Sequence, residues 1–219
     1  LCVIILTVLN IPLTTRYGVD GTQYIRKIPL YAKLCGFLYR DWEYRDIVKG
    51  IVGDEKDEAK KALKILDWVS SNISYGVPTG LKVVDDHPLN IIIRQFGAGD
   101  QVEDIFTILC SYAGMEAGVG RCFKPGTRES MVLSFISADG RWLVIDAKNG
   151  RYFLNDNKRV AGIEDFLGGM VPLSDSDQVA YLPFLAGLKD VDTGLFTRAE
   201  EQMPLMRIPA KIKRRLNNK

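Results

Sequence analysis

Residues 97–117, GAGDQVEDIFTILCSYAGMEA, decide the fold, because they contain a glycine break, a helix and then a change of hydrophobic period. The glycines of residues 97–99 end the preceding element, and Asp100 with Glu103 three positions later is close to a capping box. Four apolar residues recur at helical spacing, namely Val102, Ile105, Phe106 and Leu109. This spacing predicts a helix over 100–113, ended by the glycine that follows.

The sequence after this helix alternates between apolar and polar residues, as half-buried strands do. Strands are predicted at 117–123, 131–137, 141–146 and 152–154, with a hairpin turn at 138–140. The sequence before it is helical in pattern. Helices are predicted over 31–48, over 54–74 with Asp54 as the cap, and over 88–96. Helices followed by antiparallel strands predict an α+β fold in which helices pack against a mostly antiparallel sheet.

The composition is that of one globular domain with extensions at its ends. The chain has 219 residues, 47% hydrophobic and 26% charged, which is enough for one core. We interpret residues 17–200 as this domain, with a short helix at 163–167 and loop and broken helix over 172–194. Residues 201–219 form a basic tail, with six basic and no acidic residues from position 207 onward. A solvated terminus is favoured over a contact with anionic lipid or nucleic acid for this tail.

The first 13 residues, LCVIILTVLNIPL, are apolar apart from Thr7 and Asn10. They fall short of the roughly 18–20 residues that span a bilayer. Two interpretations of residues 1–16 stay open. They are either the remnant of a signal peptide or membrane anchor, which Pro12 and the polar residues after it favour, or a buried strand of the domain. The first interpretation predicts membrane association and an extracytoplasmic or membrane-anchored location.

The cysteines and the histidine do not form a metal-ligand pattern. Cys2, Cys35, Cys110 and Cys122 are scattered, without CxxC or zinc-ligand spacing. A Cys110–Cys122 disulfide is one alternative, and buried free thiols are favoured over it. His87 is the only histidine, so a site with several histidines cannot form within one chain. With no EF-hand or nucleotide-binding pattern either, we expect no metal and no cofactor.

Four pieces of residues 65–153, taken in order, resemble the transglutaminase-like superfamily, relatives of the papain-type cysteine enzymes. A helix with a tryptophan ends in residues 72–75, and residues 97–117 match the family's glycine, cysteine, Asp-Gln, helix and Gly-Ile-x-Ala pattern. A strand follows where the family has its histidine, and residues 139–150, DGRWLVIDAKNG, match the strand that ends in the third catalytic residue. The resemblance implies a papain- or transglutaminase-like core. In such enzymes a thiolate at a helix start works with a histidine and an aspartate.

The positions that the resemblance assigns to catalysis carry other residues here. Counting back from the glycine that ends the helix places the cysteine at Gly99, or at Ala98 in the neighbouring register. Counting back from the strand tryptophan places the histidine at Met131, with Ser130 beside it. Neither of these can act as a general base near neutral pH. Of the three catalytic positions, only Asp146 carries the residue type of the family.

Three alternatives would preserve an enzyme. A relocated dyad of Cys110 and His87 has the wrong order for the family, and Cys110 lies ~16 Å down the helix from its activating start. Ser130 as a nucleophile has no base that can be named. A cysteine replaced experimentally by Ala98 would leave the missing histidine unexplained. All three are less favoured than loss of the catalytic residues.

We therefore interpret the chain as a pseudoenzyme of the transglutaminase and cysteine protease class. It is predicted to be a non-catalytic binding or scaffolding module for a peptide, glycopeptide or protein partner, with the cell envelope as one location. The alternative is an active cysteine protease, amidase or transglutaminase with a relocated or mutated nucleophile. The candidate groove residues are Gly99, Asp100, Gln101, Met131, Trp142 and Asp146. Asp146 is equally suited to capping the turn at 148–150.

Overall fold

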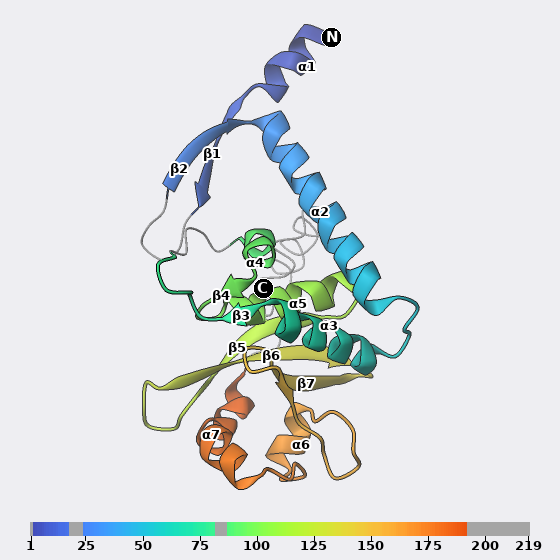
Figure 1. Cartoon of the computed structure of the whole chain (residues 1–219), viewed down its shortest axis with the longest axis vertical. Coiled ribbons are helices and arrows are strands. Elements are labelled where there is room, and N and C mark those ends of the chain that lie inside the picture. The colour runs from blue at the N-terminus through green and yellow to red at the C-terminus, as the bar shows by residue number, and fades with distance from the viewer. Residues whose placement is uncertain (1, 18–23, 82–86, 192–219) are drawn as a thin grey trace, which may run out of the picture.

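The computed structural model describes residues 2–17, 24–81 and 87–191. Its body is a four-stranded antiparallel sheet with helices on both faces, and an arm made of a helix and a hairpin projects from this body (Figure 1). The predicted class, α+β with helices packed against a mostly antiparallel sheet, is confirmed. The predicted basic tail at 201–219 lies outside the described residues.

The sheet has the strand order β5-β6-β7-β8, and its strands lie close to those expected from the alternating pattern. They are β5 (Ala117–Phe123), β6 (Ser130–Ala138), β7 (Arg141–Asp146) and β8 (Arg151–Tyr152). Asp139 and Gly140 join β6 to β7, and both have a positive φ, as a two-residue hairpin turn requires. The last strand is shorter than predicted, and Leu154 forms only an isolated bridge with Val160.

Helix α5 (Gln101–Tyr112) packs against one face of the sheet and is buried on most of its sides. Helices α3 (Glu58–Asn72) and α2 (Leu30–Val52) pack against it. Their apolar side chains form one core cluster with Ile136 of β6 and Ile145 of β7. The predicted helices over 31–48 and 54–74 are therefore present, with ends that differ by a few residues.

The predicted caps of α3 and α5 are wrong. At α3 the side chain of Asp57, and not that of Asp54, accepts a hydrogen bond from the backbone N of Lys60 at 2.9 Å. At α5 the side chain of Asp100 makes no capping hydrogen bond, and Glu103 contacts the sheet instead of the helix start. Both helix starts are rich in acidic residues, so the sequence pattern does not identify which carboxylate reaches a backbone amide.

The segment between α3 and α5 contains two very short strands and one helix. β3 (Ser74–Tyr75) and β4 (Phe96–Gly97) pair in parallel, and α4 (Pro88–Arg94) lies between them in the chain. Proline occupies the first turn of α4, as predicted for the helix over 88–96. The β3–β4 pair brings the end of α3 beside the start of α5.

The other face of the sheet is covered by α6 (Ile163–Leu167), α7 (Asp175–Leu185) and the short helix η1 (Ala186–Asp190) (Figure 1). The prediction of loop and broken helix over 172–194 agrees with the loop before α7 and with the passage of α7 into η1, whereas within α7 the helix continues through Pro183. Proline normally signals a helix break. Here the burial of Tyr181 and Leu185 in a second core cluster outweighs the tendency of Pro183 to break the helix.

The N-terminal residues form the projecting arm. α1 (Cys2–Leu9) is a helix without a buried residue, so the alternative of a buried strand is wrong for this segment. β1 (Pro12–Tyr17) and β2 (Tyr24–Pro29) pair as an antiparallel hairpin, and α2 then returns the chain to the body (Figure 1). In the described part of the chain, no helix is both long and apolar enough to cross a membrane.

Candidate functional site

The loop that leads into α5 is held in place by β3 and by the side chain of Gln101. The backbone N of Gly76 donates to the carbonyl of Gly97 at 2.7 Å. Gln101 is buried, and its side-chain oxygen accepts hydrogen bonds from the backbone N of Ala98 at 3.0 Å and from Arg94 Nη2 at 2.9 Å. Gln101 therefore positions the loop from the inside. The sequence had suggested that it lines a groove, and its burial contradicts this.

Gly99, the position predicted for the nucleophile, is exposed at the centre of this loop. Its φ is +61°, and a Cβ built on it would meet no atom within 4 Å. The space above the residue is open, but residues with a Cβ adopt this left-handed backbone only at a cost. A cysteine at this position would therefore be strained in the present loop conformation.

Charged side chains flank the loop. Asp100 Oδ2 lies 3.8 Å from Arg121 Nη2 on β5, and both side chains are partly exposed. Glu103 and Asp104 add two acidic residues to the first turn of α5. Acidic groups at a helix start offset the positive end of the helix dipole. This helix start is therefore poorly suited to lowering the pKa of a thiol or to holding an anion.

The two candidates for the histidine position lie on opposite faces of the sheet. Ser134 of β6 contacts Glu103 of α5, so even-numbered residues of this strand face α5. Ser130 shares this face by strand alternation. Met131 faces the opposite way and packs against the second core cluster. Of the two, Ser130 is therefore the residue on the face of the sheet that α5 covers.

Trp142 also lies on the far face. It is partly buried against the second core cluster, together with Met131. The structure therefore does not bring the six predicted groove residues together. Gly99, Asp100 and Gln101 lie at the start of α5, whereas Met131 and Trp142 pack on the other side of the sheet, and their inclusion in the groove is corrected here.

Asp146 lies at the end of β7 and is 2% exposed. Its carboxylate accepts three hydrogen bonds, from the backbone N of Asn149 at 3.0 Å, from Asn149 Nδ2 at 2.7 Å and from the hydroxyl of Tyr181 at 2.6 Å. Burial and the bond to Asp146 raise the pKa of Tyr181. Its two bonds from Asn149 agree with the structural role that the sequence offered for Asp146, which is to cap the turn after β7.

Glu103 is the residue of this region that the sequence did not identify. It is 1% exposed, and its carboxylate accepts hydrogen bonds from the Ser134 hydroxyl and from the backbone N of Ala147 and Lys148, at 3.3 and 3.0 Å. Burial raises the pKa of Glu103 to about 8, and the charge of nearby Asp146 also raises it. The sequence feature that could have indicated a buried Glu103 is its place in a helix that is apolar on most of its other sides.

A compact surface surrounds the start of α5. Tyr75 pairs with Gly97 across β3 and β4, and Lys148 Nζ lies 4.2 Å from the centre of its ring. The ion pair of Asp100 and Arg121 joins the same loop to β5. We call the residues Tyr75, Gly99, Asp100, Arg121 and Lys148 the helix-start surface. It combines an aromatic ring, two cations, one carboxylate and open space over a glycine.

The thiols of the described residues lie in two kinds of environment. Cys110 and Cys122 are buried, one in each core cluster, and both are free. Burial raises the pKa of Cys122 to about 12 and that of Cys110 well above its usual value. Cys2 is exposed on α1, and Cys35 is exposed on α2. His87 lies at the N-terminus of α4, where its Nδ1 accepts a hydrogen bond from a backbone amide.

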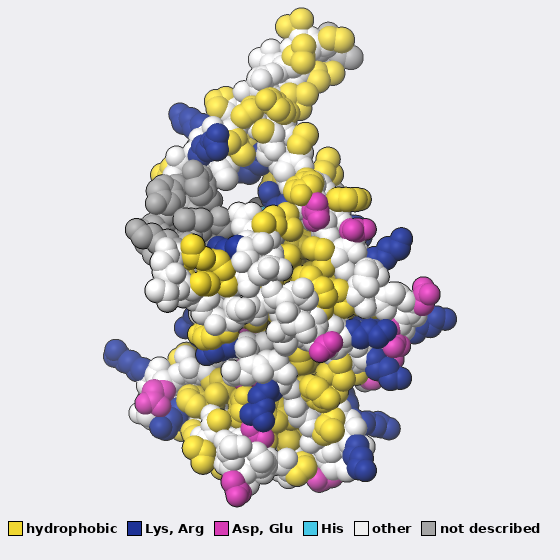
Figure 2. Space-filling model, in the orientation of Figure 1, with side chains coloured by type: hydrophobic (Ala, Val, Ile, Leu, Met, Phe, Trp, Pro, Cys, Tyr) yellow, Lys and Arg dark blue, Asp and Glu magenta, His cyan; other side chains and the backbone are white. Residues whose placement is uncertain are grey.

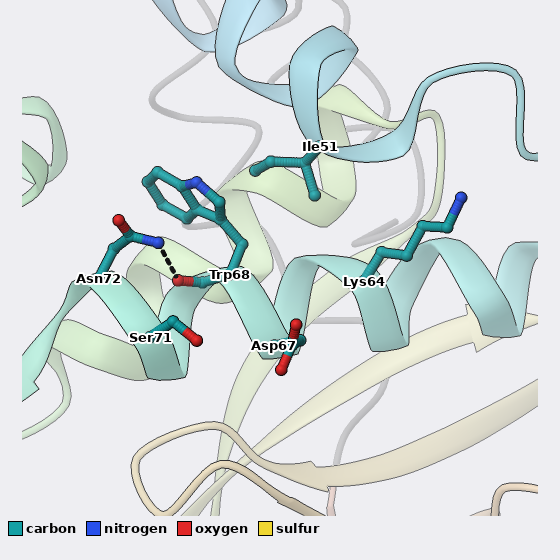
Figure 3. Close-up of a pocket in the computed structure, with 6 residues that line it drawn as sticks. All are labelled: Ile51, Lys64, Asp67, Trp68, Ser71 and Asn72. Carbon is teal, nitrogen blue, oxygen red and sulfur yellow. Dashed lines mark hydrogen bonds between the residues drawn. The ribbon is translucent and has the colours of Figure 1, made fainter.

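A cavity of about 340 Å³ lies elsewhere, between the end of α2 and the outer side of α3 (Figure 3). It is lined by Ile51, Lys64, Asp67, Trp68, Ser71 and Asn72. None of these residues belongs to the helix-start surface. Within residues 2–17, 24–81 and 87–191, no three His, Cys, Asp or Glu side chains gather into a group that could hold a metal ion.

Comparison with known proteins finds a family model that matches the central part of the chain. Residues 45–147 match the transglutaminase-like superfamily. No curated protein matches the chain. The chain is similar to a protein from Parabacteroides distasonis proposed to be a protease, with 15% identity and a TM-score of 0.40 over 63% of this chain. A protein from Cytophaga hutchinsonii proposed to be a cysteine protease has 18% identity and a TM-score of 0.38 over 58%. The chain spans only 36% and 45% of these two structures.

Proposed function

Residues 45–147 form a transglutaminase-like domain, and we propose that this domain binds a peptide segment without performing thiol chemistry. The observation that carries the proposal is the set of residues at the catalytic positions. Gly99 or Ala98 stands in place of the thiol, and Ser130 or Met131 in place of the imidazole. A thiol–imidazole mechanism needs both groups, because the histidine must accept the proton of the attacking sulfur.

The contacts of the third position support the same proposal. An aspartate that orients a catalytic histidine must present its carboxylate to the imidazole. Here Asp146 is buried and is engaged by Asn149 and Tyr181. Glu103, one turn into α5, is hydrogen-bonded to Ser134 and to the backbone after Asp146. These bonds join the helix to the sheet and serve stability.

The helix-start surface is the proposed binding surface. Tyr75 offers a half-exposed ring against which an apolar side chain can pack, and Arg121 and Lys148 offer hydrogen-bond donors for carbonyl or carboxylate oxygens. The open space over Gly99 lets a ligand backbone approach the loop closely. These features favour a peptide or glycopeptide over an apolar small molecule.

The test is a binding screen followed by hydrogen exchange. The protein is probed against an array of synthetic peptides and a set of cell-wall glycopeptides, and the tightest binder is carried into exchange measurements. We expect slower amide exchange in residues 97–101 and in β5, which carries Arg121, and at least about a tenfold loss of affinity in Arg121→Glu and in Lys148→Glu. Lys189→Glu, an exposed change in η1, is the matched control and keeps full affinity.

Two results would contradict the proposal. One is a tight binder whose affinity is the same in Arg121→Glu, Lys148→Glu and Lys189→Glu, because the ligand would then lie elsewhere. The other is turnover of any probe peptide that depends on Cys110 or His87.

A further inference from the structure

The arm presents an apolar helix to solvent on all of its sides. Large hydrophobic side chains of α1 are exposed by 44 to 76%, and these are Val3, Ile4, Ile5, Leu6 and Val8. They include consecutive residues, which point around the full circumference of a helix and not along one stripe. A protein groove would cover only one face of such a helix, whereas lipid would cover the helix on all of its sides.

The polar groups of this helix are satisfied within the helix itself. The hydroxyl of Thr7 donates to the carbonyl of Val3 at 2.8 Å, and Asn10 Nδ2 donates to the carbonyl of Leu6 at 2.8 Å. Internal hydrogen bonding of this kind is what a hydrocarbon environment demands, because it offers no water to polar groups. Thr7 within α1 and Asn10 just after it are therefore compatible with burial in lipid.

A basic zone follows the apolar tip. Arg26 and Lys27 lie on β2, opposite Thr15 and Thr14 respectively, three and two residues from the end of the strand that adjoins α2. Adjacent residues of a strand point to opposite faces, so the two cations flank the hairpin on both sides. Figure 2 shows basic side chains below an apolar tip on the face that it presents.

The charges of this part of the chain are almost all of one sign. From Cys2 to Arg40, the charged residues in the described ranges are Arg16, Arg26, Lys27, Lys33 and Arg40. The single acidic residue of this stretch, Asp20, lies outside the described residues. Ile11 and Tyr31 are half exposed where the hairpin meets α2. Tyrosine and basic side chains are the groups that favour the lipid head-group region.

From this order of layers we infer that the arm docks on a lipid bilayer with anionic head groups. α1 enters the hydrocarbon of one leaflet, and Arg26 and Lys27 contact the lipid phosphates. The eight described residues of α1 measure roughly 12 Å, so they fit within one half of a hydrocarbon core of ~30 Å.

The test measures binding of the full chain to phosphatidylcholine vesicles with and without about 30% phosphatidylserine. We expect stronger binding to the anionic vesicles. Ile4→Glu/Leu6→Glu should lower vesicle partitioning by at least about tenfold, because it places charge in hydrocarbon. Arg26→Gln/Lys27→Gln should lower binding to the anionic vesicles by about fivefold per residue and leave binding to neutral vesicles unchanged.

The matched control is Val179→Glu/Leu182→Glu, which changes two exposed apolar residues of α7. It should bind vesicles like the unaltered protein. Equal losses in the control and in Ile4→Glu/Leu6→Glu would overturn the inference. So would a protein that ignores both kinds of vesicle and forms a dimer that Ile4→Glu/Leu6→Glu dissociates, because a second copy would then cover the arm.

A fluorescent label measures the depth of insertion. Cys2 is exposed on α1, and an environment-sensitive fluorophore attached to it in Cys35→Ser should shift to shorter wavelength when anionic vesicles are added. The same label at Val179→Cys, in Cys2→Ser/Cys35→Ser, should not shift. A bound protein with no shift at Cys2 would overturn the insertion of α1. Neither result depends on peptide binding at the helix-start surface.

Discussion

Glu103 is a carboxyl group held inside the protein between α5 and the sheet. Its three hydrogen bonds come from the Ser134 hydroxyl and from two backbone amides after β7. Burial of the charged form is costly even when it is hydrogen-bonded, so the pKa of Glu103 rises to about 8. The three hydrogen bonds favour the ionised carboxylate and lower this pKa, but the effect of burial is larger.

The stability of the protein should depend on pH through Glu103. Its pKa is raised in the folded state, so folding is favoured at low pH, and the free energy of unfolding falls as pH rises from about 5 to 8. The fall attributable to this residue is about 5 kcal/mol at most. Urea unfolding at several pH values measures it. Glu103→Gln should lose this part of the slope, and the exposed change Glu116→Gln should keep it. A Glu103→Gln protein with the full slope contradicts the account.

The bond between Tyr181 and Asp146 should contribute to stability and not to turnover. Tyr181→Phe removes a hydroxyl donor from a carboxylate that is 2% exposed, at a cost of about 2 kcal/mol in unfolding free energy. The matched change Tyr152→Phe, in a half-exposed ring, should cost less than about 0.5 kcal/mol. Chemical denaturation of both variants compares them, and equal costs would show that the bond is not formed.

The four cysteines should divide into two reactive and two protected thiols. Cys2 and Cys35 are exposed, whereas Cys110 and Cys122 are buried with raised pKa values. A colorimetric thiol reagent should titrate two thiols in the folded protein and four after denaturation. Fast labelling of Cys110 in the folded protein would reopen a thiol mechanism, and peptide mapping of the labelled sites identifies it.

At the scale of elements, α3 shows how a local contact sets a helix boundary. Asp57→Ala removes the acceptor for the Lys60 amide, so it should destabilise the protein by about 1 kcal/mol. Asp54→Ala changes the residue that the sequence pattern favoured, and it should cost less than about 0.5 kcal/mol. Thermal unfolding of the pair decides between the two caps. A larger loss in Asp54→Ala would contradict the observed boundary.

Most elements of the body could be predicted from hydrophobic period. α5, β5 and β7 follow the sequence closely, because glycines and a change from helical to alternating pattern mark their ends. The arm was not predicted, because α1 is apolar without a stripe and so carries no period to read. α7 was expected only as broken helix within 172–194, and its continuity through Pro183 depends on packing in the second cluster.

The candidate site was predicted only in part, for a reason of register. Gly99 and Asp100 lie at the helix start as expected. Met131 does not, because adjacent residues of a strand face opposite sides and counting along the sequence carries an error of one residue. Ser130, the second residue at that position, lies on the correct face. Glu103 was predicted to take part in a capping box. Its actual contacts are with β6 and the residues after β7, and such long-range contacts cannot be predicted from the neighbouring sequence.

At the scale of the whole molecule, the body and the arm have different surfaces. The body buries its apolar side chains in clusters on both faces of one sheet. Among the residues that the structure describes, more than half of the exposed large hydrophobic side chains lie before Glu43, on the arm and the first part of α2. Figure 2 shows apolar side chains covering the tip of the arm. The proposed peptide site and the proposed lipid contact therefore occupy separate regions, and each can be removed without the other.

The most direct test of the account is an assay of turnover on peptide amides. The full chain is incubated with glutamine-containing peptides and with peptide amides, and released ammonia and new amino groups are measured beside Cys110→Ser and His87→Ala. The account predicts no release above the protein-free blank for any of the three. Release that either substitution abolishes would show a working thiol mechanism, and would contradict the claim that this transglutaminase-like domain acts by binding alone.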